Sequence, residues 1–321
     1  MTMALPLEPP IPPQLAKSAK DLPDGDGWVY EPKWDGFRTI VFRDGHEVYL
    51  QSRNGKPMNR YFPEVVESIK QMDRDRAVMD GEIIVVVDGV QEFDLLGQRI
   101  HPAESRVRML AEQWPAAYVA FDLLADGDEV LMERPYGERR ERLETTVGNP
   151  IEVTPATDDR DAAGAWLTGV SEGVVAKESA CSYKPGERVG MCKIKRVRTA
   201  DLVVVAFRFG KAEGTLGSLI LGAYDDAGEL HVVGHTSGFT AKQKRELVSF
   251  IEPYRTYERG SGEPSRWKSD EELVWEGLRP ELVVEVNFDH ITGNRIRHGA
   301  KFVRWRDDKK PSECTLEQLR G

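Results

Sequence analysis

The segment Glu31–Arg38, EPKWDGFR, is the part of the chain around which the remaining sequence is organised. Apolar residues 29–30 precede it and residues 39–42 (TIVF) follow it, so it is predicted to be a turn between two β-strands. The pattern Lys-x-Asp-Gly-x-Arg sets a lysine beside a carboxylate, a glycine and an arginine. A lysine amine attacks only when it is neutral, and nearby cations lower its pKa. Lys33 is therefore a candidate phosphate-facing nucleophile; the alternative is an ordinary hairpin turn on the surface.

Length, charge and cysteine content limit the class of protein. The 321 residues predict two domains, and the net charge of −10 means that a nucleic-acid partner would need a local basic surface. The three cysteines form no Cys-x-x-Cys pair, which argues against a disulfide framework or thiolate zinc site and favours a reducing cytoplasm. No apolar run approaches the roughly 20 residues of a membrane span. The proline-rich residues before about 23 predict an extended leader, either packed on the surface or loose.

Several strand-like segments carry charged residues that need a partner. Arg53 lies in a Ser-Arg-Asn-Gly turn, where an arginine can touch an anion, although the turn is also typical of an ordinary hairpin. Residues 77–87 form an apolar run interrupted by Asp-Gly-Glu, which includes Glu82. Carboxylates in such a strand cost desolvation energy unless a ribose hydroxyl or a metal ion binds them. The alternative is an edge strand whose acids face solvent.

Three later segments extend this pattern. Phe121 lies in a buried strand, as a core residue or as a ring that stacks on a heterocycle. Glu172 stands at the start of another apolar strand. Lys193 and Lys195 share one face of a strand, which favours an anion between or opposite them unless they mark a solvent-facing edge.

The predicted domain boundary follows Arg198. Residues 1–198 form the first domain, and short strands with glycine turns plus a helix near residues 241–251 predict a small OB-type β-barrel over residues 199–321. The last strand ends in a cluster of both charges over residues 304–310.

In chain order the motifs are Lys-x-Asp-Gly-x-Arg, Ser-Arg-Asn, Asp-Gly-Glu-Ile, Tyr-x-x-Phe-Asp, Glu-Gly-Val-Val-x-Lys, Lys-x-Lys and Arg-x-Asp-Lys. This series resembles the covalent nucleotidyltransferase superfamily, which comprises ATP-dependent DNA ligases, RNA ligases and mRNA capping enzymes. The resemblance covers roughly residues 28–310 and is strongest to bacterial DNA ligase C and the ligase module of bacterial ligase D. It implies an α+β fold: an adenylation domain of antiparallel sheets with flanking helices, then an OB-fold domain.

The resemblance also implies roles for the residues of the first domain. Lys33 would attack the α-phosphorus of ATP, release pyrophosphate and carry a covalent AMP. Glu31 would contact adenine mostly through its backbone, Phe121 would stack on adenine, and Glu82 would bind the ribose hydroxyl. Arg38 and Arg53 would bind the nucleotide phosphate or ribose and later the phosphate of the nick, tasks that suit the rigid fork of arginine.

The remaining implied roles concern the metal, the transition state and the second domain. Glu172, with Glu82 and Asp35 nearby, would hold Mg²⁺ or Mn²⁺, which prefer oxygen ligands. Lys193 and Lys195 would neutralise the α-phosphate as charge develops. The residues expected to orient the leaving pyrophosphate are Arg304, Arg306, Asp308 and Lys309, and the segment after Arg198 is the predicted hinge.

The implied reaction is the sealing of 5′-phosphate/3′-hydroxyl nicks in duplex DNA, in repair and recombination, by a cytoplasmic bacterial monomer that acts at the nucleoid. A DNA end-binding protein such as Ku is a possible partner. The candidate DNA contacts are Arg38, Arg53, Arg196, Arg198, Arg295, Arg297 and Lys301, and the alternative for the last five is ordinary solvated charge. Two other functions stay open: an RNA ligase or GTP-dependent capping enzyme, and a non-catalytic OB-containing nucleic-acid binder.

Overall fold

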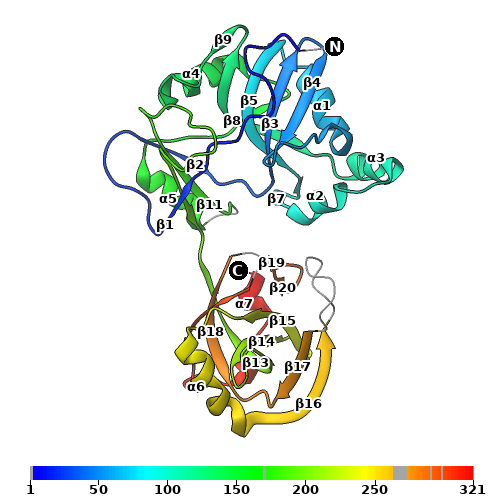
Figure 1. Cartoon of the computed structure of the whole chain (residues 1–321), viewed down its shortest axis with the longest axis vertical. Helices are drawn as coiled ribbons and strands as arrows, with labels where there is room; N and C mark the ends of the chain where they lie inside the picture. Colours follow the sequence, from blue (N-terminus) through cyan, green and yellow to red (C-terminus); the bar gives the residue numbers. More distant parts are fainter. Residues whose placement is uncertain (1–2, 169–170, 263–272, 290, 298, 321) are drawn as a thin grey trace. The chain divides into compact units, whose positions relative to one another are not determined.

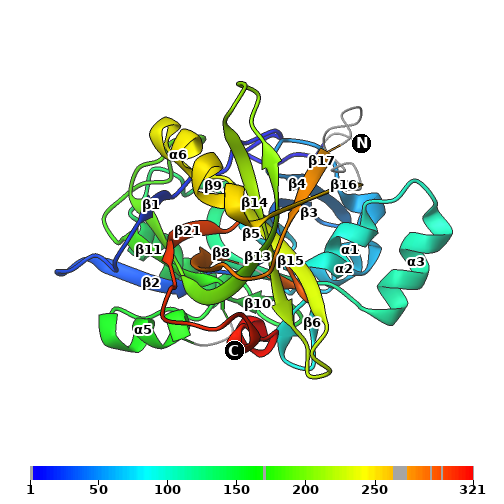
Figure 2. The same ribbon diagram turned by 90° about the horizontal axis from the view of Figure 1, so that it is seen from below.

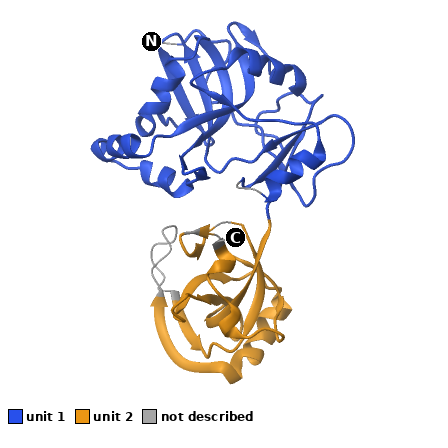
Figure 3. Cartoon of the chain, turned by 180° about the vertical axis from the view of Figure 1, so that it is seen from behind, with its two compact units in different colours: residues 1–196 blue, residues 197–321 orange. Residues whose placement is uncertain are grey.

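The computed structural model describes residues 3–168, 171–262, 273–289, 291–297 and 299–320. The chain forms two compact units, Met1–Arg196 and Val197–Gly321, which are coloured separately in Figure 3. Their division falls two residues before the predicted boundary. Each unit has its own hydrophobic core, so each is described by itself.

The first unit contains two main β-sheets (Figure 1). The larger sheet has the strand order β10-β8-β5-β3-β4, and β9 pairs with β8. Its strands are β3 (Phe37–Asp44), β4 (Glu47–Ser52), β5 (Arg76–Ile84), β8 (Ala117–Asp126), β9 (Glu129–Val130) and β10 (Glu152–Val153). The smaller sheet has the order β1-β12-β11-β2, from β1 (Lys17–Ala19), β2 (Trp28–Pro32), β11 (Gly173–Glu178) and β12 (Met191–Lys195). The Lys33 turn therefore connects the last strand of the small sheet to a central strand of the large one.

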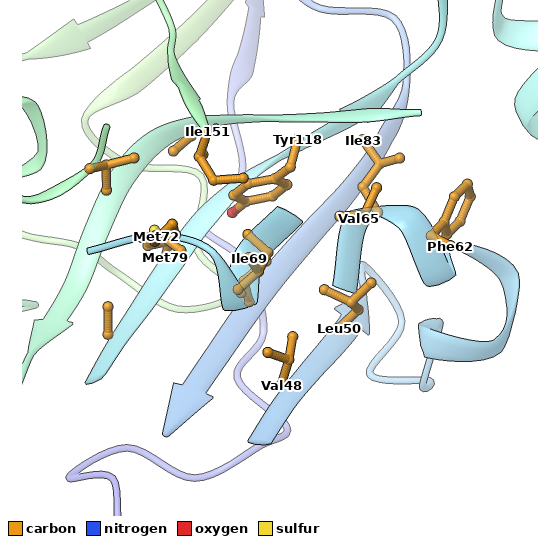
Figure 4. Close-up of a cluster of buried hydrophobic side chains, with 14 of the residues drawn as sticks. Val48, Leu50, Phe62, Val65, Ile69, Met72, Met79, Ile83, Tyr118 and Ile151 are labelled. Carbon is orange, nitrogen blue, oxygen red and sulfur yellow. The ribbon is translucent and has the colours of Figure 1, made fainter. Parts of the chain in front are cut away.

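Helices flank these sheets. They are α1 (Pro63–Lys70), α2 (Phe93–Arg99), α3 (Glu104–Gln113), α4 (Tyr136–Thr146) and α5 (Arg160–Thr168), with a 3₁₀ turn at Asn59–Tyr61 and a short β6 (Val86–Val87)–β7 (Val90–Gln91) pair. Phe62, Val65 and Ile69 repeat at helical spacing and are fully buried against Leu50 and Tyr118 of the sheet (Figure 4). This core fixes the sheet that carries the Arg38 and Glu82 side chains.

The proline-rich arm before β1 is packed rather than loose over its described residues. Leu5 and Ile11 are buried in a hydrophobic cluster. The backbone of Ile11 exchanges hydrogen bonds with the Gln51 side chain, at 2.8 Å and 2.7 Å. Beyond the arm, β1 pairs in parallel with β12. The arm is thus a structural part of the first unit.

The second unit is a curled sheet with the path β15-β14-β13-β17-β16, while β18 pairs with β13 and β21. Its strands are β13 (Arg198–Phe209), β14 (Leu216–Tyr224), β15 (Leu230–Thr236), β16 (Arg255–Gly262), β17 (Leu273–Leu278), β18 (Val283–Phe288) and β21 (Lys301–Trp305), with a β19 (Ile291–Thr292)–β20 (Arg295–Ile296) hairpin. The long β13 pairs on one side with β18 along its first half and with β17 near its end, which curls the sheet.

The helices of the second unit are α6 (Ala241–Ile251) and α7 (Glu317–Arg320), with 3₁₀ turns at Glu252–Tyr254 and Pro311–Glu313. Helix α6 begins with a capping box between Thr240 and Gln243 and contacts β14 (Figures 1 and 2). The expected helix at 241–251 has these bounds.

Candidate functional site

Lys33 is held where β2 meets β11. Its backbone N–H donates to the Gly173 carbonyl at 2.8 Å, and the Glu172 N–H donates to the Lys33 carbonyl at 3.2 Å. Gly173 has φ +153°, and a Cβ atom there would overlap the carbonyl of Ile194 on β12. The glycine therefore lets β12, which carries Lys193 and Lys195, lie against the Lys33 turn.

The Lys33 ammonium lies in an electrostatically mixed environment. Its Nζ is ion-paired with one carboxylate oxygen of Glu172, and the other oxygen pairs with Lys195 at 2.8 Å. Burial lowers the pKa of Lys33 to about 8, and Lys195 and Lys193 act in the same direction, while the carboxylates of Glu82 and Asp35 oppose them. The amine thus has a substantial neutral fraction near neutral pH.

Glu82 reaches this turn from β5. Arg38 on β3 is its direct cross-strand neighbour. A Cβ atom on Gly36 would overlap the carbonyl of Ile83 and crowd the Glu82 side chain, so only glycine lets the turn approach β5 this closely. Burial raises the pKa of Glu82 to about 7, against the opposing effect of Arg38 and Lys33.

Arg38 is anchored by a buried carboxylate that sequence analysis left without a role. Its Nε and Nη2 atoms donate to the two oxygens of Asp80 at 2.6 Å and 2.7 Å, and the Tyr183 hydroxyl donates to Asp80 at 2.6 Å. The guanidinium carbon lies 4.3 Å from the centre of the Phe121 ring. A phosphate or ribose ligand would therefore meet an arginine whose position is already fixed.

One cavity of the first unit collects most of the predicted site. Its walls include Glu31, Lys33, Arg38, Arg53, Glu82, Phe121 and Lys193 from the predicted set. Asp35 lines an adjoining hollow that also contains Lys33, Arg38, Arg53 and Glu82. Glu172 and Lys195 are connected to the cavity through their contacts around Lys33. Six separate stretches of sequence thus converge around the Lys33 amine.

The cavity wall also includes Lys177, to which the sequence interpretation gave no role although it lies in the Glu-Gly-Val-Val-x-Lys motif. Its buried ammonium pairs with Glu31 at 2.9 Å and donates to the Phe121 carbonyl at 2.9 Å. The Tyr136 hydroxyl donates to the same Glu31 carboxylate. Because the Glu31 side chain is occupied, its backbone is the part that can meet a ligand.

The N-terminal arm supplies a second wall that sequence analysis missed. Residues 13–16 line the cavity, and the Gln14 side chain donates to the Val189 carbonyl at 2.6 Å. Its backbone N–H donates to the Tyr183 hydroxyl at 3.0 Å, and its carbonyl accepts from Arg38 at 3.4 Å. No motif marks Gln14, because these contacts join segments about 170 residues apart.

The predicted pyrophosphate residues belong to the second unit and form a cluster there. Arg306 and Lys309 both donate to Asp201, at 2.9 Å and 2.8 Å, and Arg306 also pairs with Asp308. Arg304 pairs with Glu285 at 2.7 Å.

Of the remaining candidate DNA contacts, Arg196 and Arg198 lie on either side of the division between the units. Arg295, Arg297 and Lys301 lie on or beside β20 and β21 of the second unit. Their contact with DNA stays a prediction.

Comparison with known proteins identifies the family. The model described as "ATP dependent DNA ligase domain" matches residues 13–195, and that of the "ATP dependent DNA ligase C terminal region" matches residues 212–309. DNA ligase C1 of Mycolicibacterium smegmatis is 45% identical over 99% of this chain and 96% of that protein. The chain belongs to the ATP-dependent DNA ligases. DNA ligase C of Mycobacterium tuberculosis, 44% identical over the same shares, agrees with this assignment.

Solved ligase structures show the same architecture. The ligase domain of M. tuberculosis LigD is 27% identical and has a TM-score of 0.52, over 95% of this chain and 98% of that one. A mycobacterial DNA ligase D complexed with ATP and MES has a TM-score of 0.53 at the same identity and coverage. The predicted resemblance, ligase activity and fold of an adenylation domain followed by an OB-fold domain are confirmed. No described helix is long and apolar enough to cross a membrane.

ATP and a divalent metal ion are the cofactors of this ligase family, which works through a covalent AMP. Among the described residues, no group of three or more carboxylate, histidine or cysteine side chains could hold a metal ion by itself. Mg²⁺, however, usually keeps several waters and binds one or two carboxylates together with substrate phosphates. Glu172 and Glu82, both in the environment of the Lys33 amine, fit such a site.

Proposed function

We propose that this ligase seals nicks in duplex DNA with Lys33 as its nucleophile. In the first step the neutral Lys33 amine attacks the α-phosphorus of ATP, a new N–P bond forms, and the bond to pyrophosphate breaks. In the second step a 5′-phosphate oxygen of the nick attacks the AMP phosphorus, and the N–P bond to Lys33 breaks. In the third step the 3′-hydroxyl attacks that phosphate and AMP leaves. The observation that carries this proposal is a cavity-lining lysine whose pKa is lowered to about 8.

Some side chains of the cavity would contact the adenine base of ATP and others its ribose. Phe121 lies beside the Lys177–Glu31 pair, and its ring would stack on adenine while the Glu31 backbone contacts the base edge. Glu82 would accept a hydrogen bond from the ribose. The ion pair behind them supports this division, because it fixes both the Phe121 backbone and the Glu31 side chain.

The basic side chains would serve the phosphates. Arg53 and the side of Arg38 that Asp80 does not occupy would bind the nucleotide phosphate and later the nick phosphate. Lys193 and Lys195 would stabilise the charge that develops on the α-phosphate. Glu172 and Glu82, with Asp35 nearby, would hold the divalent ion, which polarises the α-phosphoryl group. By family resemblance, Arg304, Arg306, Asp308 and Lys309 are assigned to the leaving pyrophosphate.

The biological setting is proposed by analogy with the bacterial relatives. The enzyme would act as a monomer at the nucleoid, in the cytoplasm, on nicks produced during break joining or excision repair. A DNA end-binding protein such as Ku is a candidate partner. Candidate contacts to the DNA backbone are Arg38, Arg53, Arg196, Arg198, Arg295, Arg297 and Lys301.

The decisive experiment uses labelled ATP and labelled GTP with Mg²⁺, intact-mass analysis of the protein, and then nicked DNA or nicked RNA. We expect an AMP adduct that Lys33→Ala abolishes and that Lys70→Ala, a change of a partly exposed lysine on α1, leaves intact. The adduct should be consumed by nicked DNA. An adduct on Lys33→Ala would refute the nucleophile. A GTP-only adduct would indicate a capping enzyme, preference for nicked RNA an RNA ligase, and no adduct a binding module.

A further inference from the structure

Arg208 and His235 share one face of the sheet in the second unit. Arg208 on β13 is paired with Ser218 on β14, and Ile220 on β14 is paired with His235 on β15. Side chains two residues apart on a strand point to the same face, so Ser218 and Ile220, and the residues opposite them, lie on a common side. Leu219, between them, points to the core of the unit. Arg208 and His235 are therefore on the face directed away from that core.

A third basic residue completes this group. Strand β20, which contains Arg295, contacts β15 (Figure 1). Arg208 and Arg295 are the charged groups that, together with burial, lower the pKa of His235. We name these three residues the Arg208 patch.

Arg208 differs from the paired arginines of the same unit. Its Nε atom is buried and lacks a hydrogen-bond partner among the described residues, and no carboxylate there forms an ion pair with it. Arg306, by contrast, pairs with Asp201 at 2.9 Å, and Arg255 pairs with Glu276. A half-buried guanidinium without a counter-ion is costly, because it loses hydration and gains no ion pair. An external anion would remove that cost.

We propose that the Arg208 patch binds a backbone phosphate of the nicked duplex. The proposal rests on the proposed function, since the phosphodiester of a ligase substrate is the anion at hand. Guanidinium forks match phosphate oxygens, and phosphate contacts make up half or more of protein–DNA hydrogen bonds. A chain with a net charge of −10 needs local basic patches of this kind in order to hold DNA. Arg208 and His235 are thereby added to the candidate DNA contacts, among which the sequence analysis already placed Arg295.

The test compares Arg208→Gln with Arg279→Gln in the full chain. Arg279 is exposed and paired with Glu281, so its change removes the same charge from a neutralised site. Binding of a 3′-dideoxy nicked duplex is measured without ATP at several salt concentrations, and adduct formation on Lys33 is measured separately. We expect Arg208→Gln to weaken binding about tenfold near 0.1 M salt and to reduce the magnitude of the log–log salt slope by about one. Arg208→Lys should keep the slope, and adduct formation should not change.

Four results would overturn the proposal. The first is equal affinity and equal salt slope for the two glutamine variants, and the second is weaker binding by Arg208→Gln with an unchanged slope. The third is a loss of adduct formation in Arg208→Gln as large as its loss of DNA binding. The fourth is that inorganic phosphate, added at constant ionic strength, abolishes the difference in binding between wild type and Arg208→Gln. The last result would mean that the patch holds a small anion. Failure of the wild type to form an adduct on Lys33 would instead refute the proposed function, and the binding assay would still decide on the patch.

Discussion

The lowered pKa of Lys33 makes the pH dependence of self-adenylation a quantitative test of the nucleophile. With a pKa of about 8 instead of the ordinary 10.5, about 9% of the amine is neutral at pH 7, against about 0.03%. The lowering of the pKa from 10.5 to about 8 corresponds to about 3.4 kcal/mol and to an approximately 300-fold larger neutral fraction of the amine. Between pH 7 and 10 the second-order rate of adenylation should rise about 11-fold and level off, with a midpoint near 8.

The neighbouring charges should move this midpoint in opposite directions. Lys193 and Lys195 lower the pKa of Lys33, so Lys193→Gln or Lys195→Gln should raise the midpoint above 8 and decrease the neutral fraction at pH 7. Glu82 raises that pKa, so Glu82→Gln should bring the midpoint below 8. The position of the midpoint is the readout, since each variant also loses contacts that affect the maximal rate. Lys70→Gln, on α1, serves as the control and should leave the profile unchanged.

The assay follows transfer of labelled AMP to the protein with ATP well below its KM, which reports the ionisation of the free enzyme. Sealing of a pre-adenylated nick without ATP, over the same pH range, provides an internal control because the Lys33 amine does not attack in that step. A rate that climbs log-linearly to pH 10, by several hundred-fold, would mean an ordinary lysine pKa of about 10.5 and would refute the reasoning. Midpoint shifts of the same sign in the lysine and glutamate variants would do so as well.

Three further changes test the packing around the site. Gly36→Ala should destabilise the protein by about 2 kcal/mol in urea unfolding because its methyl group meets a strand carbonyl. Gly97→Ala, in open space on α2, should be neutral or stabilising. Equal effects of the two changes would contradict the close approach of the Lys33 turn to β5. Lys177→Met should cost about 3 kcal/mol because the buried Glu31 loses its nearer cation and keeps only Arg140, at 3.6 Å. Adding Glu31→Gln should restore part of that loss, and strictly additive effects would show that the two residues do not interact. Gln14→Ala should raise the KM for ATP more than it lowers kcat, and a pure loss of stability with an unchanged KM would show that the arm does not shape the cavity.

The parts of the fold that could be predicted are those with a local cause. A helix was expected at residues 241–251, and α6 has a local start signal there, because its N-terminal end carries a capping box from Thr240 to Gln243. The alternation of Lys193 and Lys195 likewise predicted a strand that presents both ammonium groups to one side, and β12 spans Met191–Lys195. In each case the structure is indicated by a residue pattern within one segment, either the alternation of side chains along a strand or the capping residues of a helix.

The parts that could not be predicted depend on segments far apart in the chain. The proline-rich arm gives no periodic signal, yet Gln14 lines the cavity and is hydrogen-bonded to Val189 and Tyr183. Lys177 was visible as the last residue of a motif, but nothing local indicates that its ammonium meets Glu31, 146 residues earlier. Such contacts require the pairing of β2 with β11, which places Val175 opposite Glu31.

Asp80 shows how strand register turns a motif into a site. The spacing of Asp80 and Glu82 puts both carboxylates on one face of a strand, and that much follows from sequence. Only the pairing of β3 with β5 sets Arg38 opposite Glu82 and within reach of Asp80. One guanidinium then compensates two carboxylates: it engages Asp80 directly, and its charge opposes the burial that raises the pKa of Glu82. The motif therefore needs two acids because the first holds the arginine in place and the second remains to meet the ligand.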